Sequence, residues 1–392
     1  MRTAALRRVT VVAAAGLLAT ACGSASVGSG GASSSAAPST SAAPSSAAGD
    51  SSQVVADAKA FVEASLSAKE GFTPPSTGPK AQKAGSTIVF VAADLTNGGI
   101  NAVSQGVKEA AGKIGWKVTV IDGKASAQGR TEALNQALAT KPAGIVLGGF
   151  DAKEQASVIK QAADLKIPVV GWHAGAAPGP DTANGLFTNV TTDPLEVSAI
   201  AAKFAIADSD GKAGVAIFTD SQYEIAVKKA DAIKAEVEKC STCKVLEYED
   251  SPIAEADSRM PALIASLLQK DGDALTYLLA INGNYFGGAR KALQDAGKPA
   301  AGPPKSVAAG DGDAAEFQRI RNGDYQAATV AEPLFLQGWQ LVDELNRAIA
   351  GEPASSFVAK PGLVTKANVP TDGDVFDPAS GYRDVYTKIW AG

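Results

Sequence analysis

Short apolar runs alternate with amphipathic helical runs along most of the chain from Ser86 onward. A run such as TIVFVAA, residues 87–93, is rich in β-branched residues and does not alternate with polar ones. Continuous apolar character of this kind is typical of a strand that is buried on both faces. Repeated strand–helix units predict a parallel sheet that is covered by helices on both sides.

The pattern occurs twice, with a break near residues 188–193. Before the break, the predicted strands are 87–93, 116–121, 144–147 and 169–172, with helices over 99–114, 127–139 and 153–165. After the break, the predicted strands are 214–218, 244–248, 274–280, 306–309 and 327–331, with helices over 194–207, 223–239, 258–270, 284–296, 313–321 and 334–350. Two successive sets of similar size predict an α/β protein with two similar lobes.

The order of these elements predicts how the chain is divided. We expect residues 86–188 and 332–365 to form the N-terminal lobe, and 189–331 and 366–392 to form the C-terminal lobe and tail. Three crossing strands near Thr188, Glu332 and Thr365 would form a hinge, with a ligand cleft between the lobes. Residues 53–85 are predicted as an N-terminal helix and linker, because apolar residues mark one helical face between Val54 and Leu66.

Polar and glycine-rich residues follow the predicted strands. In open parallel sheets, ligands bind outside the carboxyl ends of the strands. The candidate positions are therefore 94–98, 150–151, His173, 219–223, 282–284, 310–313 and Glu332. Two lobes that face each other would bring both sets of positions into one cleft.

The N-terminus has the layout of a secretory signal over residues 1–21. Three arginines precede an apolar run from Val9 to Leu18, which is too short to span a bilayer. The small residues before Cys22 resemble a bacterial lipobox, in which the cysteine becomes the first mature residue and carries lipid. An ordinary signal with an incidental cysteine is the alternative.

Residues 22–52 consist almost entirely of Ser, Ala, Gly, Pro and Thr after the cysteine. Such a segment cannot bury enough apolar surface to offset its ordering entropy, so we expect a disordered, lipid-anchored stalk. The net charge is −5, and it becomes −8 without the three arginines of the signal. An acidic body without a basic patch argues against a nucleic-acid partner.

Cys240 and Cys243 form a C-x-x-C pair, and with Cys22 they are the three cysteines of the chain. Because the compartment is predicted to be oxidising, we interpret them as a structural disulfide at a helix-to-strand turn. A redox-active pair is the alternative, but thioredoxin-like motifs lie where a helix starts after a strand. No metal site is expected, because His173 is the only histidine.

Four segments resemble the type I periplasmic sugar-binding proteins, the ribose-binding-like group, over residues 86 to about 369. They are IVFVAADLTNGG, IPVVGWHAG, LLAINGNYFGGARKALQDAG and AAGDGDAAEFQRIRNGDYQAATVAEP. The third is the most specific, because a strand ending in Asn before a G-A-x-x-A-L-x-x-A-G helix recurs in that family. The resemblance implies a two-lobed protein that captures a small ligand in its cleft.

The resemblance also implies roles for individual residues. Asn97 matches an asparagine that bonds ligand hydroxyls, and Asn282 and Asp311 match a hydroxyl-binding pair. Three positions differ from the common family residues. His173 occupies a position where the family usually has a ligand-binding aspartate, Lys229 lies near the position of a family arginine, and Glu332 occupies the position of a hinge glutamine. The aromatic pair that holds a pyranose in many relatives is absent, since Gly98 and Gly99 occupy that turn.

Two tyrosines complete the candidate ligand site. Tyr223 and Tyr285 begin predicted helices that face the cleft, and either could stack on a ring. Each could equally be ordinary packing. A site of mixed charge formed by these residues would accept a sugar, a polyol, an amino sugar or a small zwitterion.

The sequence thus predicts a monomeric, exported solute-binding lipoprotein on the extracellular face of the membrane. It would deliver a small polar ligand, with a sugar or polyol favoured, to an ABC permease by hinge closure. A receptor that presents ligand to a membrane sensor, or a binding protein for an amino acid or nucleoside, is the alternative. An enzyme is not expected, because no nucleophile elbow, Walker or Rossmann glycine motif follows a strand, and no cofactor is implied. A ligand-sensing repressor would need a helix-turn-helix in place of the signal and stalk.

Overall fold

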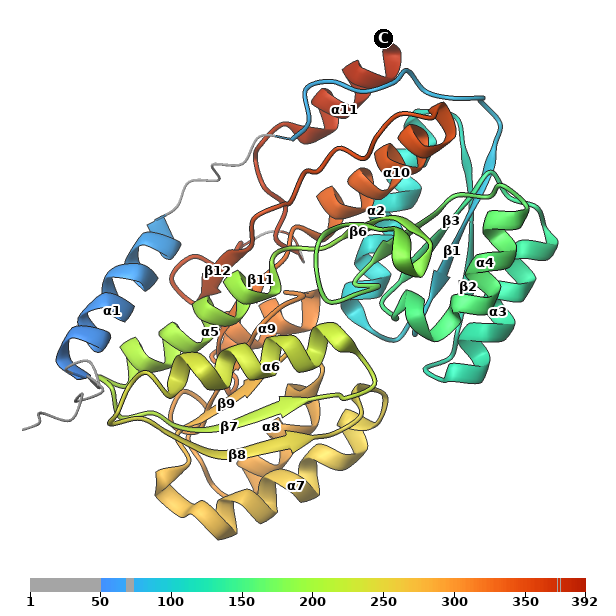
Figure 1. The fold of residues 1–392 in the computed structure, drawn as a ribbon. Coiled ribbons are helices and arrows are strands. Elements are labelled where there is room, and N and C mark those ends of the chain that lie inside the picture. Colours follow the sequence, from blue (N-terminus) through green and yellow to red (C-terminus); the bar gives the residue numbers. More distant parts are fainter. Residues whose placement is uncertain (1–50, 68–73, 372, 374) are drawn as a thin grey trace, which may run out of the picture. The chain divides into compact units, whose positions relative to one another are not determined.

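The computed structural model describes residues 51–67, 74–371, 373 and 375–392. The predicted signal, Cys22 and all but the last two residues of the predicted stalk lie outside these residues. Two six-stranded sheets, each flanked by helices, form the two lobes (Figure 1). The predicted α/β fold of two similar lobes is confirmed.

The first sheet has the strand order β2-β1-β3-β4-β6-β5. Its pairs are parallel except for β5 with β6, and the central β1 is almost completely buried. The strands are β1 (Thr87–Ala92), β2 (Lys117–Asp122), β3 (Gly144–Gly148), β4 (Val169–Trp172), β5 (Gly179–Asp181) and β6 (Leu186–Val190). Between them lie α2 (Gly98–Lys113), α3 (Ala127–Ala139), η1 (Ala152–Gln155), α4 (Ala156–Asp164) and η2 (Thr182–Asn184).

The second sheet has the order β12-β11-β10-β9-β7-β8, with one antiparallel pair, β11 with β12. The strands are β7 (Gly214–Thr219), β8 (Lys244–Asp250), β9 (Tyr277–Ala280), β10 (Lys305–Ala308), β11 (Gln326–Ala331) and β12 (Gly362–Thr365). The helices are α5 (Pro194–Asp208), α6 (Glu224–Val237), η3 (Ile253–Glu255), α7 (Ala256–Asp271), η4 (Gly272–Ala274), α8 (Tyr285–Asp295) and α9 (Ala314–Asn322). A disulfide joins Cys240 and Cys243 between α6 and β8, as predicted.

The C-terminal third differs from the predicted division of the chain. Helix α10 (Leu334–Ala350) packs on the first lobe, but β12 lies in the second, where it pairs with β11. The predicted C-terminal-lobe tail contains α11 (Tyr382–Ala391), which belongs to the first lobe. Its aromatic face explains this position, because the Trp390 ring stacks on Trp339 of α10 with the ring centroids 5.5 Å apart.

The chain passes between the lobes several times within the described residues. The crossings expected near Thr188 and Glu332 follow β6 and β11 directly. In place of a single crossing near Thr365, two segments flank β12, at 351–361 and 366–381.

Helix α1 (Ser51–Ser67) packs on α5 and β12 of the second lobe, with Ala58 buried. It begins at Ser51, so the last two residues of the predicted stalk are helical. Among the residues that the structure describes, no helix is both long and apolar enough to cross a bilayer.

Candidate functional site

A cavity of about 60 Å³ lies where the carboxyl ends of the two sheets meet. Residues after β1, β3 and β4 line it from the first lobe, and residues after β7, β9 and β10 line it from the second. Six of the eight predicted ligand-binding residues are among them: Asn97, His173, Tyr223, Lys229, Asn282 and Asp311. Candidate residues from the two halves of the sequence therefore surround a single cavity.

Glu332 lies directly behind this cavity, at the crossing after β11, and it is completely buried. Its Oε1 atom is 3.2 Å from Nζ of Lys229, and its Oε2 atom is 3.1 Å from Nε2 of His173. Oε2 also accepts hydrogen bonds from Gln337 Nε2 and, at 3.4 Å, from the backbone of Thr192. Glu332 therefore fixes His173 of one lobe and Lys229 of the other rather than facing the cavity itself.

The protonation states in this cluster follow from burial and from these contacts. Burial lowers the pKa of His173 below its usual value, although Glu332 opposes this, so the imidazole is neutral at pH 7 and donates through Nε2. Burial alone would raise the pKa of Glu332, but His173, Lys229 and Gln337 outweigh it and hold that pKa well below its usual range. The Lys229–Glu332 pair is therefore a buried ion pair.

Asp311 is the acidic side chain that faces the cavity from the second lobe. Burial raises its pKa to about 8, although Lys229 acts against the rise. Among the described residues no group donates a hydrogen bond to its carboxylate. Its backbone is in the left-handed region, at φ 52°, where a non-glycine residue is strained. Glu316 holds the loop in this conformation by accepting a hydrogen bond from the Gly312 backbone.

The two asparagines keep their local loops in shape with their oxygens. Asn97 Oδ1 accepts from the Ile100 backbone and caps α2, and Asn282 Oδ1 accepts from the Asn284 backbone. Neither Nδ2 group has a hydrogen-bond partner among the described residues. Both amides line the cavity, so each has donors left for a ligand.

The glycines that stand in place of the family's aromatic pair have a structural reason. A Cβ atom on Gly99 would lie 2.7 Å from Oδ2 of Asp311, and one on Gly98 would lie 2.1 Å from Oδ2 of Asp313. Both carboxylates belong to the second lobe. Only glycine allows the first turn of α2 to approach them so closely.

The interpretation of Tyr285 as a ligand-binding residue is wrong for this structure. Its side chain is fully buried in the second lobe, its ring packs against Phe218, and its hydroxyl donates to the Ser251 carbonyl. It does not line the cavity. Tyr285 begins α8 as predicted, but its ring points into the core.

Trp172 lines the cavity, although its position next to His173 predicts a packing role. Its ring stacks on His173, with the centroids 3.9 Å apart, and its Nε1 donates to Gln337. Neighbouring residues of a strand normally point to opposite faces. Here His173 has φ 48°, which breaks the alternation.

His173, Asp311 and Glu332 each bring one possible ligand atom for a cation to within 4.8 Å of the others. The ammonium group of Lys229 already occupies the neighbourhood of Glu332 as the positive charge. The donor set is therefore better suited to an organic ligand with polar hydrogens than to a metal ion.

A wide groove of about 1650 Å³ adjoins the cavity. The two share the lining residues Asp94, Asn97, Ile253 and Ala254. The cavity alone is smaller than the pockets of roughly 300 Å³ or more that enclose small-molecule ligands. These shared residues mark the side from which a ligand would enter when the lobes separate.

The geometry is that of a two-lobed binding site, and a family model described as a periplasmic binding protein domain matches residues 88–353. The chain belongs to the periplasmic binding protein family. The family predicted from the four sequence segments is confirmed. A comparison with curated proteins finds no match for this periplasmic binding protein.

Solved structures share the fold of this periplasmic binding protein. An ABC transporter solute-binding protein from Agrobacterium vitis, bound with α-D-tagatopyranose, has a TM-score of 0.65 at 18% identity, and the match covers 73% of this chain and 96% of that one. A protein of the same kind from Bacillus halodurans with bound myo-inositol has a TM-score of 0.63 at 17% identity, covering 74% and 97%. A glucose-galactose binding protein from Geobacillus stearothermophilus has a TM-score of 0.65 at 21% identity, covering 74% and 100%.

Proposed function

We propose that this periplasmic binding protein captures a small polar ligand, a sugar or polyol, between its lobes and delivers it to an ABC permease. The observation that carries the proposal is the shared cavity. Unpaired amide donors of Asn97 and Asn282 and the carboxylate of Asp311 line it together, from both lobes. Paired acceptors and donors of this kind suit vicinal hydroxyl groups.

Three further points support the proposal. Two of the solved neighbours are ABC transporter solute-binding proteins with bound tagatose or myo-inositol, and the third is a glucose-galactose binding protein. Lys229 is the one lysine or arginine among the described residues that line the cavity, and it is paired with Glu332. A site without an unpaired cation disfavours an anionic ligand. None of the described residues that line the cavity is a serine, threonine or cysteine, so the site lacks an aliphatic hydroxyl or thiol nucleophile that His173 could activate.

One observation favours a second ligand class, which carries an amino group. Asp311 has a carboxylate without a donor from the described protein residues, and a protonated amine would supply both the hydrogen bond and the compensating charge. Amino sugars and amino acids share this chemistry.

A thermal-shift screen of the purified protein against sugars, polyols, amino sugars, amino acids and nucleosides tests the ligand class. Ligand at a hundred times its dissociation constant should add about 2.7 kcal/mol of stability. A shift with neutral sugars or polyols supports the first class, and a shift with amines alone supports the second. Stabilisation by nucleosides alone would contradict both.

We also propose that the protein is exported and anchored through lipid on Cys22. Labelling cells with a radioactive fatty acid should mark the wild-type chain and leave Cys22→Ser unmarked. Uptake of labelled ligand by cells that lack the protein then separates import from sensing. Loss of uptake supports the permease partner, whereas normal uptake with a lost transcriptional response supports a membrane sensor.

A further inference from the structure

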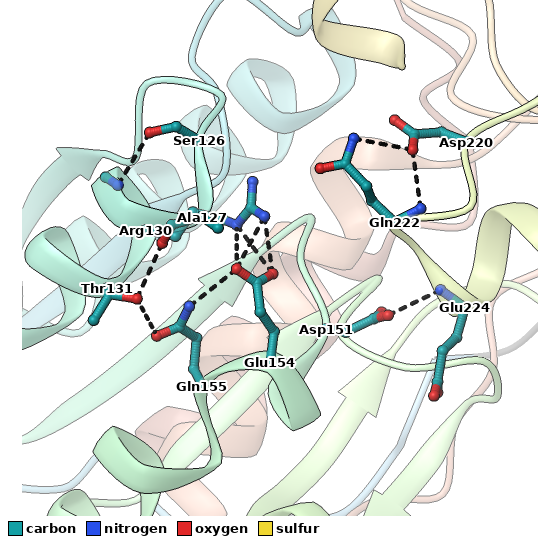
Figure 2. Close-up of polar contacts among 11 residues, drawn as sticks. Ser126, Ala127, Arg130, Thr131, Asp151, Glu154, Gln155, Asp220, Gln222 and Glu224 are labelled. Carbon is teal, nitrogen blue, oxygen red and sulfur yellow. Dashed lines mark hydrogen bonds and ion pairs between the residues drawn. The ribbon is translucent and has the colours of Figure 1, made fainter. Parts of the chain in front are cut away.

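Asp151, which follows β3 in the first lobe, is bonded to a helix of the second lobe. Its Oδ2 atom accepts a hydrogen bond of 2.9 Å from the backbone N–H of Glu224, the first residue of α6 (Figure 2). The residue before α6 is Tyr223, whose side chain does not cap the helix. The first turn of α6 therefore receives its side-chain acceptor from the opposite lobe.

We propose that Asp151 is a latch between the lobes, which caps α6 only when the lobes are closed and thereby sets the fraction of closed protein. The latch itself does not depend on the proposed function. Only its expected effect on ligand affinity rests on that function. If closing and binding are coupled, the apparent dissociation constant rises as the closed fraction falls. Asp151 would then control affinity as a positioning residue, since it does not line the cavity.

The contacts around the latch join the same two surfaces. Arg130 of the first lobe is buried and donates to both oxygens of Glu154, which fixes its guanidinium (Figure 2). That guanidinium lies 5.8 Å from the ring centroid of Tyr223 in the second lobe. One turn further along α6, Lys228 Nζ donates to the Ala176 carbonyl of the first lobe at 2.8 Å. The first turns of α6 are thus the docking element of the closed form.

The N-terminus of α6 also attracts the Asp151 carboxyl oxygen electrostatically. An α-helix has a partial positive charge at its N-terminus, where N–H groups lack partners within the helix. When the lobes separate, the Glu224 N–H and the Asp151 carboxyl group both return to water. The latch therefore forms and breaks with lobe movement, unlike a cap supplied from within one lobe, such as Ser126 on α3.

The latch should respond to pH. Burial raises the pKa of Asp151 to about 6, although the hydrogen bond from Glu224 opposes the rise. The charged groups that act on it are Glu224 of α6 and, from η1, Glu154 and Lys153. Since the separated lobes expose Asp151 and restore a lower pKa, the closed form binds a proton between about pH 4 and 6. Acidification through this range strengthens the latch, because burying the neutral acid costs less than burying the carboxylate, and this difference outweighs the preference of the helix N-terminus for the charged form. The neutral acid still accepts the Glu224 bond through its carbonyl oxygen.

Interlobe distances in the ligand-free full chain test the latch without any assumption about the ligand. Spin labels on cysteines at Lys160 and Lys291, both on exposed helical surfaces, report one lobe each. At pH 5, Asp151→Ala should shift the distance distribution toward longer values than the wild type. Asp151→Asn, which retains the acceptor, should keep the wild-type distribution. The wild type should open between pH 5 and 8, and Asp151→Asn should not.

Ser126→Ala is the matched control, because it removes a helix cap that lies within the first lobe. It should lower the melting temperature and leave the interlobe distance unchanged. The same result for Asp151→Ala, a lower melting temperature with an unchanged distance, would overturn the latch. An equal pH response of wild type and Asp151→Asn would also overturn it.

Affinity is measured separately, with the ligand found by the screen. Asp151→Ala should raise the dissociation constant at pH 5 by about fivefold, the effect expected for one lost cap on a helix. If interlobe distances change as predicted but no sugar, polyol or amine binds, the proposed function fails and the latch stands. If a ligand binds and the distances do not change, the latch fails alone.

Discussion

The Nε2 atom of His173 lies 3.1 Å from Oε2 of Glu332, and this contact bonds the end of β4 in the first lobe to the chain that follows β11 in the second. The other oxygen of Glu332 holds Lys229. One buried carboxylate at the hinge thereby positions a cavity-lining side chain from each lobe. The Glu332 carboxylate thus contacts both lobes. Because Glu332 does not line the cavity, its substitution should lower the free energy of unfolding without removing a direct ligand contact.

Glu332→Gln should destabilise the protein by about 3–5 kcal/mol, because it leaves the Lys229 ammonium buried without its counter-charge. An amide at this position would also turn a donor toward the donors of Gln337 and Thr192. Urea denaturation measures the loss. Glu196→Gln is the control, since its pair with Lys360 is at the surface and should contribute about 1 kcal/mol or less. Equal losses for the two variants would contradict the role of Glu332.

Asp311→Asn should stabilise the ligand-free protein at alkaline pH. The pKa of Asp311 is raised to about 8 in the folded protein, so the native state keeps a proton that the unfolded state loses from about pH 4 upward. The contribution of Asp311 to the free energy of unfolding therefore falls as pH rises from about 4 to about 8. The variant should gain melting temperature over the wild type at pH 8 and gain less at pH 5. A pH-independent difference would show that Asp311 titrates normally.

At pH 9, where Asp311 is ionised in the folded protein, Asp311→Ala should weaken ligand binding by more than about tenfold, given roughly 1.5–3 kcal/mol for a hydrogen bond to a charged group. Titration calorimetry with the ligand from the screen gives the dissociation constant. An unchanged dissociation constant would remove Asp311 from the site.

Gly99→Ala should weaken binding by at least about tenfold while the protein remains folded. A methyl group there would lie 2.7 Å from Oδ2 of Asp311, so the lobes could not reach their present approach. Calorimetry measures the affinity and thermal denaturation the folding. Gly112→Ala, in the same helix but with no atom within 4 Å of the added methyl, should bind ligand normally. It should also be slightly stabilised, because Ala is the better helix former. Normal binding by both variants would mean that closure does not need this contact.

Tyr285→Phe should leave affinity unchanged and reduce stability by about 1 kcal/mol, because its hydroxyl bonds Ser251 and does not reach the cavity. Calorimetry and urea denaturation separate the two effects. A clear loss of affinity with unchanged stability would restore Tyr285 to the ligand site.

The two sheets, and the placement of six of the eight candidate residues around one cavity, could be predicted from the sequence, because both depend on local rules. Buried parallel strands are continuously apolar, as in β1 and β7, and polar residues that line the cavity follow strand ends, as His173 and Asp311 do. The sequence predicts Glu332 at the hinge and also as a ligand-binding residue, but it does not line the cavity. Its actual contacts with His173 and Lys229 join residues 159 and 103 positions apart in sequence, so no local rule reveals them.

The rest could not be predicted because it depends on tertiary packing. The strand β12 is four residues long, and only its pairing with β11 defines it. Helix α11 is amphipathic, but nothing local indicates that its aromatic face fits Trp339 of the first lobe. The positive φ of His173 places its ring on the ring of Trp172 instead of on the opposite face of the strand, and the orientation of Tyr285 depends on which face of α8 the core covers.

A crystal structure of the protein with the tightest-binding ligand from the screen would show whether the ligand is held between the lobes. Ligand density should lie between the lobes, with hydrogen bonds to Asn97 from the first lobe and to Asn282 and Asp311 from the second. Ligand bound at full occupancy to one lobe only, or in a place where neither Asp311 nor Asn97 touches it, would contradict capture of the ligand between the two lobes.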